Sequence, residues 1–332
     1  MKLIFISLIL FFISIDARSQ QSNYEKLRII KNLDRIAFGS CNKQFSTQDL
    51  WKDLIQQRPD LFIWGGDNVY ANTTTAANIL KSYQLQNDVD DYRFFKSITP
   101  IIGTWDDHDY GNNDEDGHFS LKKISQEYAL NFLEEPLFSP RRFREGIYTS
   151  YSFGVARKKI KIIVLDNRYF MNLEKTAPLL GHQQWEWLKK EVANSDASLH
   201  LVVSGLSVIS PSNPSSEEWE DFPDEKKKLR KIMESRKVPY LYLTGDKHFS
   251  SIFEKEGETE FMSSGMTHNT RLPLRPWVRV KYPEPIFIHN YGLIDFSWDK
   301  NSPLLNLSIR SAEGVNLVQK KIKWHNQAWY EY

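Results

Sequence analysis

Short apolar runs alternate with amphipathic segments along the first half of the chain. A run of four to seven apolar residues bounded by turn residues predicts a buried strand, and apolar positions three and four apart predict a helix. Strands are therefore expected at residues 35–41, 60–64 and 100–105. Helices are expected at residues 46–58, 74–98 and 120–134, and the first of them has Ser46 as its expected N-cap.

The second half of the chain has the same alternation but contains more strand-like segments. Strands are expected at residues 148–153, 159–165, 200–208, 239–243, 285–298 and 304–309, the first two as a hairpin. Helices are expected at residues 181–193 and 226–237. Strand and helix alternation followed by a strand-rich C-terminus predicts an α/β fold in which helices flank two packed sheets.

The N-terminus is typical of a secretory signal peptide. Lys2 precedes an apolar stretch over residues 3–15, and Ala17-Arg18-Ser19 places small residues before an expected cut at Gln20. A membrane anchor is the alternative, but such a stretch is too short for a bilayer core of about 30 Å. We therefore expect residues 1–19 to be removed, residues 20–332 to form one domain, and the protein to be exported, either periplasmic or secreted, with no membrane span in the mature chain.

Composition and charge narrow the range of functions. Of the 332 residues, 41% are hydrophobic and 14% aromatic, which indicates a folded chain with a substantial core. The formal charge of +1 provides no basic patch for nucleic acid, and we find no protein-binding motif. Cys41 is the only cysteine, so an intrachain disulfide is excluded.

Polar clusters follow five of the expected strands. They are Ser40-Cys41-Asn42, Gly66-Asp67-Asn68, Asp106-Asp107-His108-Asp109, Asp166-Asn167-Arg168 and Gly245-Asp246-Lys247-His248. Each alone has a plainer interpretation, such as a turn or a packed thiol. Because ligands bind at the carboxyl ends of strands in open α/β sheets, the five together predict one site.

The residue types in these clusters predict metal chemistry. Asp67, Asp107 and Asp246 would be costly to place together without cations between them. His248 adds a nitrogen donor and Cys41 a sulfur donor, which indicates more than one metal of different softness. Two close metals suit phosphoryl transfer by an activated hydroxide. On this hypothesis Asp67 bridges the metals, while Arg168 clamps a phosphate and His108 protonates the leaving group.

Together the five motifs resemble the PhoD-like alkaline phosphatase/phosphodiesterase family of the calcineurin-like metallophosphoesterase superfamily. Their order agrees with that family, and the match runs from about Arg35 to the C-terminus. The resemblance implies a four-layer α/β/β/α sandwich. It also implies hydrolysis of phosphate mono- or diesters at a site that holds Fe³⁺ and Ca²⁺, with a small phosphate ester as substrate.

The resemblance also implies roles for single residues. Cys41 and Tyr70 resemble the iron ligands, Asp67 the bridging aspartate, and Asp107, Asp246 and His248 the remaining acidic and histidine ligands. Asn112 or Asn113 completes the calcium side; spacing does not choose between them, and Asn113 is the working choice. Arg168 and Asn68 are the expected substrate-binding residues, and His108 and Asp67 the expected catalytic ones.

Two alternatives to this phosphatase remain at the level of sequence. One keeps the metals but acts on phospholipid or nucleotide diesters. The other is a non-catalytic binding protein on the same scaffold, although retention of Asp67 and His248 disfavours it.

Overall fold

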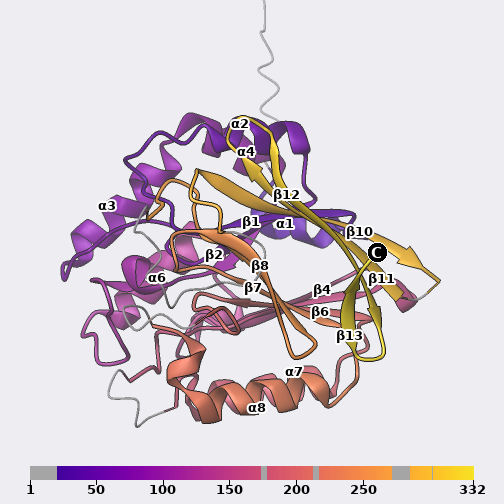
Figure 1. The fold of residues 1–332 in the computed structure, drawn as a ribbon. Coiled ribbons are helices and arrows are strands. Elements are labelled where there is room, and N and C mark those ends of the chain that lie inside the picture. The colour runs from indigo at the N-terminus through magenta and orange to yellow at the C-terminus, as the bar shows by residue number, and fades with distance from the viewer. Residues whose placement is uncertain (1–20, 173–177, 212–216, 271–284, 301) are drawn as a thin grey trace, which may run out of the picture.

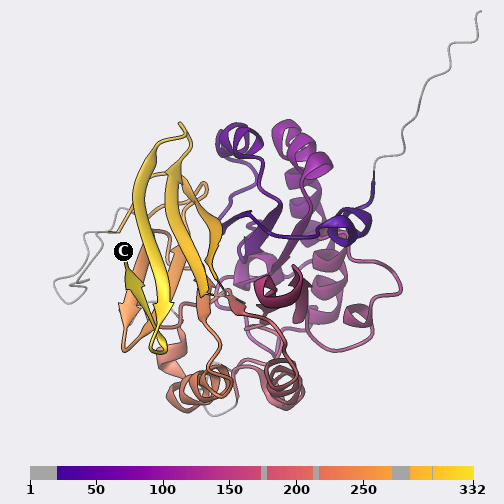
Figure 2. The same ribbon diagram turned by 90° about the vertical axis from the view of Figure 1, so that its right-hand side faces the viewer.

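The computed structural model describes residues 21–172, 178–211, 217–270, 285–300 and 302–332. Two β-sheets pack face to face, and helices cover their outer faces (Figures 1 and 2), which confirms the predicted four-layer sandwich. The expected leader at residues 1–19 lies outside the described residues. Within the described ranges, none of the helices has both the length and the apolar content that a membrane crossing requires.

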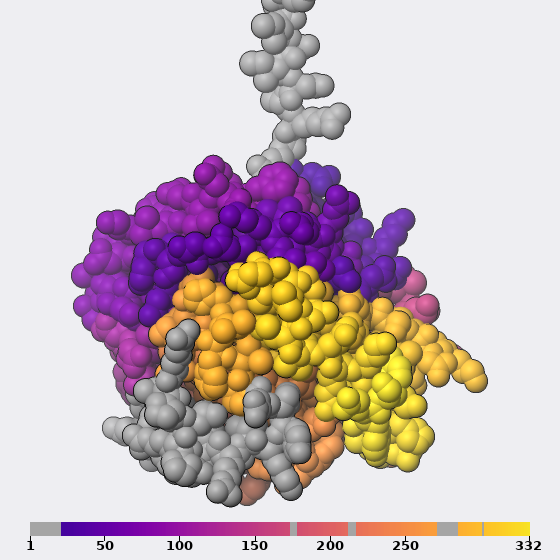
Figure 3. All heavy atoms as spheres, turned by 45° about the horizontal axis from the view of Figure 1, so that its top comes forward, coloured from indigo at the N-terminus to yellow at the C-terminus, as the bar shows by residue number. Residues whose placement is uncertain are grey.

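The first sheet joins the two ends of the chain. Its seven strands follow the order β13-β12-β11-β10-β1-β2-β3. Their bounds are β1 Arg35–Gly39, β2 Leu61–Gly65, β3 Ile101–Thr104, β10 Asn290–Asp299, β11 Ser302–Ser311, β12 Asn316–His325 and β13 Ala328–Glu331. β1, β2 and β3 are parallel, whereas β10 pairs antiparallel with β1. Figure 3 shows the C-terminal strands in yellow lying against the N-terminal segment in indigo.

The second sheet comes from the middle of the chain and has six strands in the order β4-β5-β6-β7-β9-β8. Their bounds are β4 Thr149–Phe153, β5 Ile160–Val164, β6 Leu199–Ser204, β7 Tyr240–Thr244, β8 Ser250–Lys255 and β9 Glu258–Ser263. β4 and β5 form the expected hairpin, and β5, β6, β7 and β9 are parallel neighbours. Each sheet therefore contains a run of parallel strands, β1-β2-β3 at one side of the first sheet and β5-β6-β7-β9 in the second, whose carboxyl ends can present loops.

Central strands are buried on both faces, which explains why most of their positions are apolar. In β1, Ile36 and Phe38 face the core between the sheets, whereas Ala37 packs with the outer helices. In β6, Leu201 and Val203 join the same inter-sheet core, and the residue between them packs toward the other helix layer. Successive side chains of a strand point to opposite faces, so each central strand contributes to two layers of packing.

Helices on the outer faces complete the layers (Figure 1). The first sheet is covered by α2 Leu50–Gln57, α3 Ala76–Asn87, α4 Asp90–Ile98 and α6 Lys122–Phe132. The second is covered by α7 Gly181–Ala193 and α8 Pro223–Glu234. The remaining helices are α1 Asn23–Ile29, the one-turn α5 Asp107–Tyr110 and short 3₁₀ turns at Pro140–Arg142, Ala156–Lys158 and Trp219–Asp221.

The structure corrects the expected start of the first helix. α2 begins at Leu50, after Asp49, and not at Ser46. Residues before it are held by buried glutamine side chains instead: Gln44 donates to the carbonyl of Tyr70 over 3.1 Å and accepts the Tyr70 N–H over 2.8 Å. These bonds fix an irregular segment beside the end of β2, and a helix there would break them.

Candidate metal centre

The carboxyl ends of strands from both sheets meet at one place. Backbone hydrogen bonds join them, from Ser40 N–H to the carbonyl of Ser263 over 3.0 Å and from Asn42 N–H to the carbonyl of Asp67 over 2.9 Å. Gly245 fits only because it lacks a side chain, since a Cβ there would lie 2.3 Å from Ser40 Oγ. The sheets therefore bring the predicted polar clusters together, as the strand-end argument expected.

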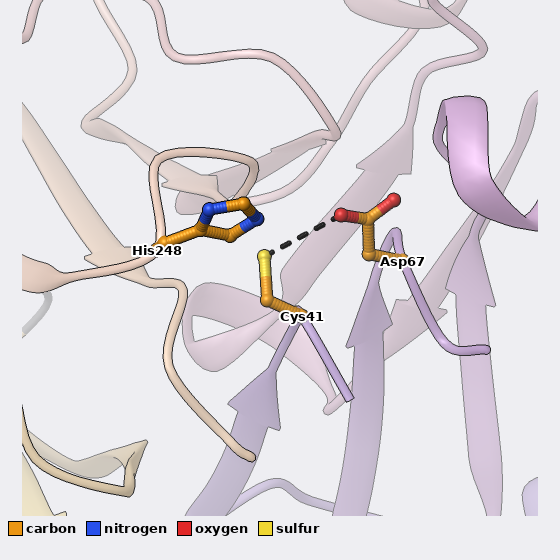
Figure 4. A group of neighbouring side chains, drawn as sticks. All are labelled: Cys41, Asp67 and His248. Atoms are coloured by element: carbon orange, nitrogen blue, oxygen red, sulfur yellow. Dashed lines mark hydrogen bonds between the residues drawn. The ribbon is translucent and has the colours of Figure 1, made fainter. Parts of the chain in front are cut away.

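Cys41, Asp67 and His248 form the first group of donors (Figure 4). One ligand atom of each lies within 4.8 Å of the others, and Cys41 Sγ is 3.6 Å from Asp67 Oδ2. Tyr70 Oη lies 3.1 Å from both Asp67 Oδ2 and His248 Nε2. A thiol, a phenol, an imidazole and a carboxylate thus converge, and this donor set suits a ferric ion.

Two further groups of donor residues adjoin the first: Asp67 belongs to the first and second groups, and Asp107 to the second and third. Asp67, Asp107 and His108 have ligand atoms within 4.8 Å of one another, and so do Asp106, Asp107 and Asp246. Asp67 belongs to the groups on both sides of it, which is the position that a bridging carboxylate requires. The third group is composed entirely of carboxylates, which suit a hard cation such as Ca²⁺.

Buried oxygens without hydrogen-bond partners indicate that the centre is built for cations. Within the described part of the chain, Asp67 Oδ1, Asp106 Oδ2, Asp107 Oδ1 and Asp246 Oδ2 accept no hydrogen bond. A buried polar atom left unpaired costs about 1–3 kcal/mol, and more when it is charged. Four such oxygens at one place are explained if metal ions coordinate them, so the residues present fit the implied metals.

Burial among other acids also shifts the pKa values of these carboxyl groups. Burial, reinforced by Cys41 and Asp107, raises the pKa of Asp67 well above its usual range. Burial likewise raises the pKa of Asp246 to about 8 and that of Asp106 to about 6. Burial alone would raise the pKa of Asp107 as well, but the Arg168 guanidinium holds it below its usual range. Without cations the centre therefore retains protons that bound metals would displace.

Backbone conformation at the strand ends is strained. Cys41, Asp67, Asp246 and His248 have φ angles of 59°, 51°, 71° and 59°, in the left-handed region. Each such residue costs on the order of 1 kcal/mol relative to a relaxed backbone. Four of the predicted ligands share this conformation, and three of them, Cys41, Asp67 and His248, have ligand atoms within 4.8 Å of one another.

His108 is buried beside this centre. Its ring packs on Tyr70 with centroids 4.1 Å apart, and its Nδ1 is hydrogen-bonded to Asn72 Oδ1. Burial lowers its pKa, so the neutral imidazole is favoured in the absence of metals. The contacts fix the ring next to Asp67 and Asp107, where a proton donor to a leaving group would be needed.

Arg168 differs from the expected phosphate clamp. Its side chain is 0% exposed, and Nε and Nη1 pair with Asp106 and Glu217, while Nη2 lies 3.5 Å from Asp107 Oδ1. These three carboxylates occupy the directions that a phosphate would need. In this geometry Arg168 is a positioning residue that neutralises and orients Asp106 and Asp107.

The predicted asparagine residues have different surroundings. Asn68 is buried, and its Nδ2 donates to the carbonyl of Thr104 over 2.8 Å while its Oδ1 accepts nothing from the described residues. The atom of Asn68 that has no partner is therefore Oδ1, a hydrogen-bond acceptor. It suits contact with a cation better than contact with a phosphate oxygen, which is itself an acceptor. Asn112 donates to Glu115 and Asn113 is exposed, so the choice between them stays open.

The structure places two further residues here: His268, for which the sequence suggested only a place in a substrate-side loop, and Asp109, which had no assigned role. His268 Nδ1 lies 3.2 Å from Tyr70 Oη, and its ring centroid is 3.9 Å from that of His248. Asp109 accepts the backbone N–H groups of Asn68, Val69 and Asp106, and burial raises its pKa to about 8. The polar Ser-Ser-Gly run after β9 was the available indication for His268, because it marks another strand end.

The retained protons predict how stability depends on pH. In metal-free protein the free energy of unfolding should fall between about pH 7 and 8. The reason is that folded Asp109 and Asp246 hold protons up to about pH 8, whereas unfolded carboxyl groups lose them near 3.8. Burial lowers the pKa values of four histidines, which oppose the fall below about pH 7, where their unfolded forms still bind protons: His108, His200, His248 and His268. The slope should be about 1.4 kcal/mol per pH unit for each proton held only in the folded state.

Urea unfolding of chelator-treated protein at several pH values measures this slope. Added Fe³⁺ and Ca²⁺ should abolish the fall, because metals replace the protons. A metal-free protein whose stability rises over the same interval would contradict the protonated centre.

Comparisons with known proteins agree with this geometry. A family model described as PhoD-like phosphatase matches residues 36–273. The solved structure of PhoD is similar with a TM-score of 0.64 at 15% identity, over 90% of this chain and 72% of that one. GAP50, the anchor in the inner membrane complex of Plasmodium, is similar with a TM-score of 0.55 at 12% identity, over 89% of this chain and 90% of that one. No curated protein matches the chain. At such identities the two structures show a shared fold.

Proposed function

The chain belongs to the PhoD-like phosphatase family and is a metal-dependent hydrolase of phosphate esters, and from this premise we propose that hydrolysis takes place at the strand-end cluster with one ferric ion and one Ca²⁺. Cys41, Tyr70 and His248 would hold the ferric ion, and Asp107 and Asp246 the calcium ion. Asp67 would contact both. The observation that carries this proposal is the group of four buried carboxylate oxygens without hydrogen-bond partners.

The residues of the chain would have separate roles in hydrolysis. When bound, the two ions lower the pKa of a water molecule and offset the negative charge that develops on the phosphoryl oxygens. Asp67 holds the two halves of the centre together, and Arg168 keeps Asp106 and Asp107 oriented. His108, fixed by Asn72 and Tyr70, donates a proton to the leaving oxygen.

A substrate panel tests the proposal. Purified protein should hydrolyse p-nitrophenyl phosphate or its diester, bis(p-nitrophenyl) phosphate, and a chelator should abolish both activities until metals are restored. The panel also separates monoester from diester preference. Metal-loaded protein that hydrolyses neither ester would instead favour a binding protein on this scaffold.

Replacing His108 by alanine should slow hydrolysis in a way that depends on the leaving group. A proton donor matters most when the departing alcohol is a poor leaving group, so we expect losses of about 10²–10⁴-fold for alkyl phosphates. For p-nitrophenyl phosphate, whose leaving group needs little protonation, the loss should be much smaller. Equal losses in kcat across the series would assign His108 a positioning role.

The sulfur of Cys41 should be visible in the absorbance spectrum. Burial raises the pKa of the Cys41 thiol to about 11, so it stays protonated unless a metal displaces the proton. A thiolate and the Tyr70 phenolate on ferric iron should then give a coloured protein. Cys41→Ser should remove the thiolate part of that band and weaken iron binding more than calcium binding. A colourless, active enzyme whose metal content Cys41→Ser leaves unchanged would refute this assignment.

Export is the remaining part of the proposal. Lys2, the apolar stretch over residues 3–15 and the small residues before Gln20 support cleavage of a leader. N-terminal sequencing of exported protein should begin at or near Gln20, and an intact Met1 in the mature protein would contradict the cleavage.

A further inference from the structure

A large cleft adjoins the candidate metal centre. Its volume is about 680 Å³, which lies within the range of small-molecule sites. Four segments of the chain line it: the residues before and at the start of α2, the loop after β9, the residues before β10, and the turn between β11 and β12. The cleft is therefore built where the N-terminal and C-terminal parts of the first sheet meet the second sheet.

His268 connects this cleft to the metal centre. It lines the cleft, and its ring also contacts the predicted ligands Tyr70 and His248. The cleft therefore offers space for an alcohol group beside a phosphate held at the metals. The sequence run Gly265-Met266-Thr267-His268 had indicated a loop on the substrate side.

The loop that carries His268 is fixed in place. Met266 N–H and Thr267 N–H donate to the carbonyls of Ser40 and Cys41 over 3.1 and 3.2 Å. Thr267 Oγ1 accepts the Lys43 N–H over 2.6 Å. Because the same loop binds the Cys41 segment and lines the cleft, the distance between metal centre and cleft is set by backbone hydrogen bonds.

Charged residues differ between the metal centre and the cleft. Lys43 Nζ lies 5.3 Å from the centre of the Tyr70 ring, at the metal end, where it favours a phosphate. The described residues that line the cleft include Asp49 and Glu313 but neither a lysine nor an arginine. Lys52 pairs with Asp49 over 2.9 Å and offsets part of its charge, and His289, which also lines the cleft, favours the charged form of Glu313. Apolar surface between the ends comes from Leu50 and Phe287.

We propose that this cleft binds the alcohol portion of the phosphate ester and selects alcohols that are uncharged or carry an ammonium group over alcohols that carry an acidic group. The proposal rests on the proposed function, because the phosphate end of the substrate must sit at the metal centre. A second phosphate or a carboxylate on the alcohol would face Asp49 and Glu313 with no lysine or arginine among the described lining residues. An ammonium group would be attracted by the same two side chains.

Three aryl phosphates with matched leaving groups test the selection. Tyramine phosphate, para-propylphenyl phosphate and the phosphate of para-hydroxyphenylpropanoate differ in the charge at the end of the para chain and hardly in the acidity of the phenol. We expect kcat/KM to fall in that order at low ionic strength. Each step should be at most about fivefold, since exposed charges contribute little and salt screens them.

Two variants and a control assign the selection to the cleft. Glu313→Gln, and Asp49→Asn to a smaller extent, should reduce the ratio of kcat/KM between the ammonium and carboxylate esters. Glu186→Gln on α7, at an exposed position in the opposite helix layer, should leave that ratio unchanged. A ratio near one in the wild-type enzyme, or a ratio unaffected by Glu313→Gln, would overturn the inference while leaving the proposed function intact. Failure to hydrolyse any of the three esters would overturn both.

Discussion

Replacing Asp67 by alanine is expected to reduce kcat by at least about a thousandfold, which corresponds to about 4 kcal/mol of lost transition-state stabilisation. The size of the effect follows from its position. Asp67 is the one carboxylate shared by the Cys41–His248 group and the Asp107–His108 group. Its loss removes a ligand from both ions at once, so metal content measured by elemental analysis should fall together with the activity.

Stability separates this result from misfolding. Asp67 is buried among other acids, so Asp67→Ala removes a carboxyl group that is costly to bury, and the metal-free variant should unfold cooperatively with a stability close to that of metal-free wild type. Asp224→Ala on α8, at an exposed carboxylate, is the matched control and should keep full activity and metal content. An Asp67→Ala protein that binds both metals and turns over normally would contradict the proposed centre.

Replacing Arg168 by methionine is expected to destabilise the metal-free fold by about 3–5 kcal/mol, because one side of a buried ion-pair network is removed. The buried Asp106 and Asp107 and the partly buried Glu217 would lose the guanidinium that neutralises them. Methionine has a similar length, so little cavity volume is added. Bound metals should recover part of the loss, since cations would then neutralise Asp106 and Asp107.

Urea unfolding with and without metals measures the effect of Arg168→Met. Arg93→Met, at an exposed pair with Asp90, is the control and should change stability by less than about 1 kcal/mol. An Arg168→Met protein of normal stability and normal kcat, with only KM raised, would restore the phosphate clamp that the sequence suggested.

The layers of the fold were predictable because the central strands are largely apolar runs bounded by polar turn residues. β2 is apolar throughout and is followed directly by Gly66-Asp67. β7 is largely apolar and is followed directly by Gly245-Asp246. An apolar run that ends at polar turn residues predicts both the strand and the strand end at which functional side chains lie. Because each sheet contains a run of parallel strands, knowledge of the strand ends was enough to group Cys41, Asp67, Asp107, Asp246 and His248.

Other features depend on contacts between distant residues, which periodicity does not describe. The sequence shows Arg168 next to a strand end, but not that three buried carboxylates face it. Helix α1 is short and is held by Asn23, whose side chain bonds to the backbone of Ile101 and Leu133. The α2 start was wrong for the same reason, since buried Gln44 overrides the local preference of Ser46 for an N-cap.

The pairing of β1 with β10 has a consequence for the order in which the chain can fold. Arg35 pairs with Asp295, 260 residues further along, so the first sheet lacks the neighbour of β1 until the C-terminal strands are available. Contacts of such long range form slowly, because the intervening chain must be ordered first. An unfinished chain therefore exposes the edge of β1 and stays incompletely folded until its last strands emerge. A polypeptide that crosses a membrane before it folds needs this property, so the topology of the first sheet is compatible with the proposed export.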